Sequence, residues 1–131
     1  MRAALVLAGG NSAWSGMPVE EGAEHGILFA AEVAQMNLLG AELVALSACE
    51  TALGEVKNGE GLQRAFKLAG AETLVMSLWR VDDQASSELM DRFYRNWLSG
   101  MGKQAAFKAA QGAVRAQYPD PKYWAAFVLM D

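Results

Sequence analysis

The chain has 131 residues, one cysteine, one histidine and a formal net charge of −4. With 53% hydrophobic and 20% charged residues it is typical of one folded globular domain, here residues 1–131, rather than of a disordered segment. The acidic balance argues against nucleic-acid binding, which ordinarily uses a basic face, and no run of about 18 apolar residues predicts a membrane span.

The composition also argues against an internal disulfide, a zinc site and a nucleotide cofactor. One cysteine forms no internal disulfide, so we expect a reducing, cytoplasmic location. One cysteine and one histidine are too few soft ligands for a zinc site, and the turn Gly9-Gly10-Asn11 lacks the Gly-Lys-Ser/Thr continuation of a phosphate loop. We therefore expect no metal and no cofactor.

The predicted strands are four short apolar runs. Residues 3–8, 43–47 and 73–78 are apolar on both faces and bounded by glycine or polar residues, as in a parallel sheet covered on both sides. A fourth run, residues 124–130, closes the chain. Four strands make a narrow sheet, so we expect a piece of a larger domain, or a sheet edge that pairs with another chain.

Helical patterns lie between the predicted strands. Residues 32–38 predict a short helix, and residues 62–69 have apolar side chains at helical spacing before a natural stop at Gly70. A longer helix is expected from Asp83 to residues 99–100, with an Asp or Ser cap. An alanine-rich helix over 105–114 is ended by the prolines of residues 119–121. Strands alternating with helices predict an α/β fold with a mostly parallel sheet and flanking helices.

Cys49 is the most informative residue, because it follows directly on a predicted buried strand. Open α/β sheets place binding and catalytic groups at the carboxyl ends of their strands. A free cysteine is also often a small buried hydrophobic residue. Position alone therefore leaves a reactive thiol and an inert one both open.

The run Leu43-Val44-Ala45-Leu46-Ser47-Ala48-Cys49-Glu50-Thr51-Ala52-Leu53-Gly54 resembles the CHAT family of caspase-like domains, which are often fused to tetratricopeptide (TPR) repeats. The similarity continues in order through residues 59–62, 65–71, 77–83, 89–94, 110–111 and 123–129, and upstream through residues 5–11 and 26–28. Ser-Ala-Cys-Glu-Thr together with Ser-Leu-Trp is specific. The resemblance implies a caspase-hemoglobinase fold, a Cys–His peptidase dyad, a protein or peptide substrate and TPR repeats in the parent protein.

Cys49 matches the family's nucleophile, whereas His25 does not match its base. In the family the catalytic His-Gly ends a strand that precedes the stretch equivalent to residues 5–11, so the base is expected ahead of Met1. Only 48 residues precede Cys49, and the caspase base lies roughly 50 residues upstream of the cysteine. We interpret His25 as a solvated loop histidine. The chain thus resembles the C-terminal two-thirds of the domain and is expected to lack its N-terminal strands.

Asp82 and Asp83 follow the predicted strand at 73–78, on the sheet edge expected for Cys49. They are candidates for binding a basic substrate side chain; alternatively Asp83 caps the next helix, which we favour. Trp79 and Trp124 are expected to pack at the core or its rim, or to form an aromatic wall for a peptide.

Two functions remain open. The first is a portion of a cysteine endopeptidase domain whose base comes from outside this sequence. The second is a catalytically inactive interaction or scaffold module derived from such a domain. In either case we expect a homo-oligomer formed through the exposed sheet edge.

Overall fold

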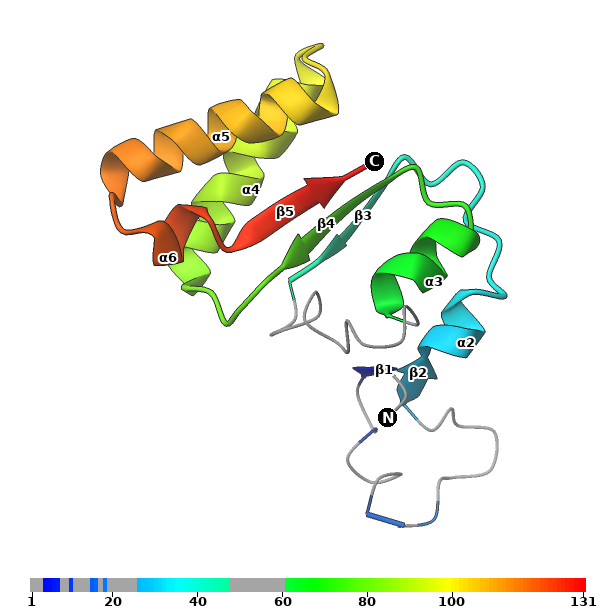
Figure 1. Ribbon diagram of the computed structural model, residues 1–131. Coiled ribbons are helices and arrows are strands. Elements are labelled where there is room, and N and C mark those ends of the chain that lie inside the picture. Colours follow the sequence, from blue (N-terminus) through cyan, green and yellow to red (C-terminus); the bar gives the residue numbers. More distant parts are fainter. Residues whose placement is uncertain (1–3, 8–9, 11–14, 17, 19–25, 48–60) are drawn as a thin grey trace. The chain divides into compact units, whose positions relative to one another are not determined.

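The computed structural model describes residues 4–7, 10, 15–16, 18, 26–47 and 61–131 (Figure 1). The chain divides into two compact units. The first comprises Met1–Glu42 and Gly54–Glu72, and the second comprises Leu43–Leu53 and Thr73–Asp131. The mixture of helices and strands confirms the α/β class, and both sheets are small.

The two-stranded sheet of the described residues is antiparallel and lies in the first unit, together with the short helices α2 and α3. Strand β1 (Ala4–Val6) pairs with β2 (Ile27–Phe29), which is not among the four predicted strands. Helix α2 (Ala30–Val33) follows β2 directly, and the Glu32 carboxylate accepts a hydrogen bond from the Phe29 amide at 2.7 Å. The helix predicted over 32–38 was wrong in extent, since only its first residues are helical.

Helix α3 (Leu62–Leu68) packs against α2 through buried apolar residues and ends where the sequence predicts. Gly70 adopts a φ of +103°, a conformation that favours glycine. The Leu38 amide donates to the Ala69 carbonyl at 2.8 Å, so the turn after α3 is joined to the segment that follows α2. The buried residues shared by these elements are Val33, Leu62, Ala65, Phe66 and Ala69.

In the part of the second unit that the structure describes, three strands form a sheet in the order β3-β4-β5. Strand β3 (Leu43–Leu46) runs parallel to β4 (Thr73–Ser77). Strand β5 (Phe127–Met130) pairs with the other side of β4 and runs antiparallel to β4. Parallel pairing among the described strands is therefore confined to β3–β4. Every residue of β4, the central strand of this sheet, is buried.

Two long helices cover one face of this sheet. Helices α4 (Asp83–Leu98) and α5 (Lys103–Gln117) lie side by side (Figure 1). Phe93 of α4 meets Phe107 of α5 edge-to-face, with ring centroids 5.6 Å apart. The fully or nearly buried core of the unit comprises Val75, Leu89, Phe93, Ala106, Phe107, Ala110, Val114, Ala126 and Phe127.

A short helix, α6 (Pro121–Trp124), connects α5 to β5. The apolar run at 124–130 therefore begins as helix and becomes strand only at Phe127. The cause is local, because the Asp120 carboxylate accepts from the Lys122 amide at 3.0 Å and Pro121 occupies the first helical turn.

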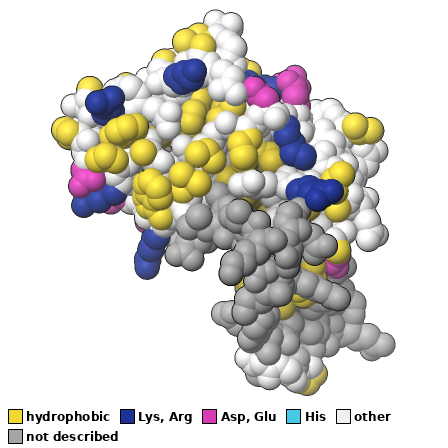
Figure 2. Space-filling model, viewed as in Figure 1, with side chains coloured by type: hydrophobic (Ala, Val, Ile, Leu, Met, Phe, Trp, Pro, Cys, Tyr) yellow, Lys and Arg dark blue, Asp and Glu magenta, His cyan; other side chains and the backbone are white. Residues whose placement is uncertain are grey.

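Apolar side chains also reach the surface. Figure 2 shows them on one face of the molecule, lying between lysine and arginine side chains. In the described part of the second unit, Leu98 at the end of α4 is the most exposed large hydrophobic residue, at 79%. Single exposures of this kind are ordinary in globular proteins.

Candidate active-site edge of the sheet

The carboxyl ends of β3 and β4 define one edge of the sheet in the second unit. Leu46, the last residue of β3, pairs with Met76, so β4 extends one residue further than β3 at this edge. Ser77, the last residue of β4, is fully buried. The chain leaves β4 here through residues 78–82 and leaves β3 through Ser47, which is exposed.

Cys49 and His25 both lie outside the described residues. The nucleophile position of Cys49 and the loop position of His25 therefore remain predictions. What the structure does describe is the strand that leads to Cys49 and the partner loop after β4.

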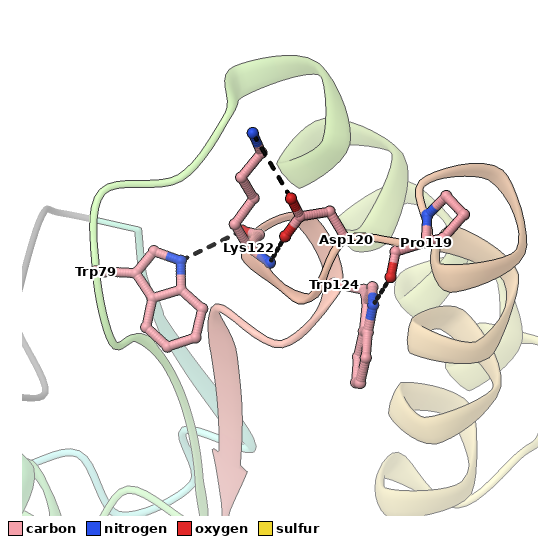
Figure 3. A network of polar contacts seen from close by, with 5 residues as sticks. All are labelled: Trp79, Pro119, Asp120, Lys122 and Trp124. Atoms are coloured by element: carbon pink, nitrogen blue, oxygen red, sulfur yellow. Dashed lines mark hydrogen bonds and ion pairs between the residues drawn. The ribbon is translucent and has the colours of Figure 1, made fainter.

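The loop after β4 is held at its start by two hydrogen bonds to the segment around α6. The Leu78 amide donates to the Ala126 carbonyl at 2.7 Å. The indole Nε1–H of Trp79 donates to the Lys122 carbonyl at 3.2 Å (Figure 3). Trp79 is partly buried against the apolar core, which agrees with the predicted packing at the core or its rim.

Asp82 fixes the other end of the loop. Its Oδ1 accepts a hydrogen bond from the Ala85 amide at 2.9 Å, and its carbonyl accepts from the Ser86 hydroxyl at 2.6 Å. Asp82 is thus the N-cap of α4, and Asp83 is the first helical residue. The prediction that Asp83 caps the helix was therefore wrong, and the cap is the preceding residue. The backbone of Asp82 is extended, whereas that of Asp83 is already helical.

Asp83 is exposed in the first turn of α4. A carboxylate there interacts favourably with the helix dipole. Of the two candidate substrate-binding residues, Asp82 therefore has one oxygen committed to its own helix, while no hydrogen bond of the described residues engages the Asp83 carboxylate.

The corner that receives Trp79 is itself fixed by several contacts (Figure 3). The Trp124 indole donates to the Pro119 carbonyl at 3.2 Å, and its ring lies under the Arg115 guanidinium at 5.1 Å. The Gln111 side-chain amide donates to the carbonyls of Trp124 and Phe127, at 3.1 and 3.2 Å. Gln111 thereby joins α5 to both ends of the α6–β5 junction.

Tyr118 adds a polar contact between α4 and this corner. Its hydroxyl donates to Glu88 Oε1 at 3.2 Å, and its ring lies 5.2 Å from that of Tyr123. Loss of hydration and the neighbouring Glu88 carboxylate, with a smaller contribution from Asp82, raise the pKa of Tyr118 above its ordinary value of 10.0.

Sequence reasoning did not find the bracing residues Lys122 and Gln111. Trp79 donates to a backbone carbonyl 43 positions away in the sequence. Every residue type has such a carbonyl, so the amino-acid sequence does not identify the acceptor. The only available signal was Asp120 between two prolines, which is typical of a capped helical turn.

The described residues contain no group of three His, Cys, Asp or Glu side chains placed to hold a metal ion. No helix within the described ranges is both long and apolar enough to span a bilayer.

Comparison with known proteins identifies the family. The CHAT domain model matches residues 1–131. The chain is 33% identical over 109 residues to tetratricopeptide repeat protein 28 of Mus musculus, and equally to that of Homo sapiens. Each alignment covers 79% of this chain but only 4% of the relative. The chain therefore belongs to the CHAT domain family.

Proposed function

We propose that this chain forms part of a caspase-like cysteine endopeptidase domain in which Cys49 is the nucleophile. The observation that carries the proposal is the Ser-Ala-Cys-Glu-Thr sequence directly after β3, a strand that pairs in parallel with β4. Membership of the CHAT family supports it. The carboxyl edge of a parallel pair is where α/β proteins ordinarily place reactive groups.

In the proposed reaction the Cys49 thiolate attacks the carbonyl carbon of the scissile peptide bond. Collapse of the tetrahedral adduct breaks the C–N bond, and the amine leaves with a proton supplied by the base. Water then hydrolyses the acyl-enzyme and regenerates the thiol. The base is proposed to come from outside these 131 residues, so the isolated chain is expected to be inactive.

The test is the rate of Cys49 alkylation by iodoacetamide as a function of pH. Cys49 is the only cysteine, so the incorporated label reports one site, and Cys49→Ala is the blank. Without a base in the chain, the profile of both wild type and His25→Ala is expected to follow the ordinary thiol pKa of about 8.5. A thiolate that persists well below about pH 7 and is lost in His25→Ala would make His25 the base and overturn this assignment.

Substrate recognition at this edge is proposed to involve the acidic pair. Asp83 is the stronger candidate for a basic substrate side chain, because one Asp82 oxygen already caps α4. Asp83→Asn is expected to reduce the labelling of Cys49 by an arginyl chloromethyl ketone relative to its citrulline analogue. An unchanged ratio would remove Asp83 from the site.

The second candidate is an inactive interaction module. It is favoured by the single histidine, His25, which does not match the family's base. The two functions predict different results in the full-length natural protein. If the domain is a peptidase, Cys49→Ala is expected to abolish cleavage of a bound protein without abolishing binding. If the domain is an inactive module, the wild-type protein is expected to bind its partner without cleaving it, and the scaffold function then replaces the peptidase.

Two assembly properties belong to the same proposal. The relatives are named for tetratricopeptide repeats, which supports TPR repeats as neighbours of this domain in its parent protein. Among the described strands β3 pairs with β4 alone, which supports association of two copies through the β3 edge. Light scattering is expected to give a mass above 14.1 kDa that falls on dilution, and a constant monomer mass would contradict it.

A further inference from the structure

Trp79 follows β4 at the same sequence distance from its last paired position as Cys49 follows β3. Leu46 pairs with Met76, and Cys49 and Trp79 each follow three residues after these partners. The two strands of a parallel pair run in the same direction, so the chain leaves both of them at the same edge of the sheet. The loop of residues 78–82 therefore begins at the edge to which the nucleophile is assigned.

Hydrogen bonds hold this loop near both of its ends. Near its start the Trp79 indole donates to the Lys122 carbonyl, and at its end Asp82 accepts from the Ala85 amide. Arg80 and Val81 lie between these two attachments. The Trp79 bond is the only described side-chain hydrogen bond that joins residues 78–81 to α6.

The acceptor of this bond is held by contacts that do not involve the loop. The Lys122 amide donates to the Asp120 carboxylate at 3.0 Å, and the Lys122 ammonium lies 3.9 Å from the same carboxylate (Figure 3). The Gln111 side-chain amide donates to the carbonyl of Trp124, the last residue of α6. The Lys122 carbonyl that accepts the Trp79 hydrogen bond therefore lies in a helix that is held by Gln111 of α5 and by the Asp120 cap.

We propose that Trp79 is a positioning residue of the candidate site: its indole N–H fixes the loop of residues 78–82 against α6, and so holds one wall of the peptide-binding edge. The proposal rests on the proposed peptidase function. Trp79 acts through the loop and takes no part in bond making or breaking.

Trp79→Phe tests the bond, because phenylalanine keeps an aromatic ring but has no N–H donor. Trp124→Phe is the matched control. It removes an indole hydrogen bond of the same 3.2 Å length, but one directed to Pro119 instead of anchoring the loop.

The first measurement is amide hydrogen exchange of a peptide that spans residues 78–85. Trp79→Phe is expected to accelerate its exchange about fivefold, the equilibrium factor of one ordinary neutral hydrogen bond. Trp124→Phe leaves the Trp79 hydrogen bond itself in place and is expected to accelerate this exchange clearly less. Equal acceleration in both variants, or none in Trp79→Phe, overturns the proposal.

The second measurement compares two labels of Cys49 at about pH 9, where a thiolate forms without a base. The labels are iodoacetamide, which makes no peptide contacts, and a tripeptidyl chloromethyl ketone. Trp79→Phe is expected to slow the peptidyl label about fivefold, in line with one lost hydrogen bond, and to leave the iodoacetamide rate unchanged. A merely structural role would alter both rates or neither.

The two measurements separate failure of this proposal from failure of the peptidase function. If wild type reacts no faster with the peptidyl label than a free thiol does, the peptidase function fails. Accelerated exchange in Trp79→Phe would then still show a braced loop, but the positioning role would be overturned. If the peptidyl label reacts selectively with wild type and equally well with Trp79→Phe, only the positioning role fails.

Discussion

At the scale of single residues, the Tyr118 hydroxyl contributes a stability that depends on pH. Partial loss of hydration and the Glu88 carboxylate favour the neutral phenol in the folded protein, so its pKa is raised above 10.0. A raised folded-state pKa gives stabilisation that is fully present below the unfolded pKa. That stabilisation is lost as the pH rises through the folded pKa.

Tyr118→Phe removes both the hydrogen bond to Glu88 and this titration. In urea unfolding, wild type is expected to be the more stable protein below pH 10.0, and the difference is expected to shrink above it. Comparing the two proteins at each pH cancels the titration of shared groups. A difference that grows with rising pH would contradict the sign of the shift.

The cap at Asp82 gives a second residue-scale prediction. Asp82→Ala removes the oxygen that accepts from the Ala85 amide and is expected to lower the free energy of unfolding by about 1 kcal/mol. Asp83→Ala, which alters the first helical residue, is expected to cost less than about 0.5 kcal/mol. Urea denaturation measures both, and the reverse order would assign the cap to Asp83.

These residue roles were only partly predictable. Two adjacent aspartates before a helical pattern predict a cap, but which of them is extended depends on how the loop after β4 is held. The aromatic type of Trp79 predicted rim packing, whereas its hydrogen bond depends on a backbone carbonyl contributed by a distant segment. Local patterns contain no information on such pairings.

At the scale of elements, glycine after α3 predicts the end of that helix, and the structure shows why another residue is excluded. A Cβ at Gly70 would lie 2.8 Å from a Leu39 side-chain carbon. Gly40 also has a positive φ, of 95°, but a Cβ there would contact no described atom within 4 Å.

Gly70→Ala and Gly40→Ala therefore separate backbone strain from steric overlap. Each alanine is expected to cost about 1–2 kcal/mol through its left-handed backbone. Gly70→Ala is expected to cost more, because the Leu39 side chain must also move. Thermal unfolding of the two variants measures the difference, and equal shifts in Tm would show that Leu39 moves without cost.

The other elements differ in how well the sequence pattern predicts them, and the reason is physical. The long helices α4 and α5 were predictable, because their apolar stripes extend over several turns. The run at 124–130 has apolar residues throughout, so periodicity could not separate the helical turn at Pro121–Trp124 from the strand Phe127–Met130. The Asp120 cap decides that boundary.

At the scale of the whole molecule, the path of the chain joins the two compact units. The second unit begins at Leu43–Leu53, the chain returns to the first unit at Gly54–Glu72, and it then completes the second. Neither unit is a continuous segment. Because the family model also matches residues 1–131 throughout, we propose that both units belong to a single domain.

Phe93→Ala tests this proposal. Phe93 is fully buried and contacts Phe107, so its truncation is expected to destabilise the second unit by about 3–5 kcal/mol. If the units unfold together, hydrogen exchange of the most protected amides of α3, in the first unit, accelerates by the same factor as that of α5. Phe107→Leu, a milder truncation of the same contact, is expected to shift both elements by a smaller common factor. Unchanged exchange in α3 would mean that the first unit folds independently, and the single-domain proposal would fail.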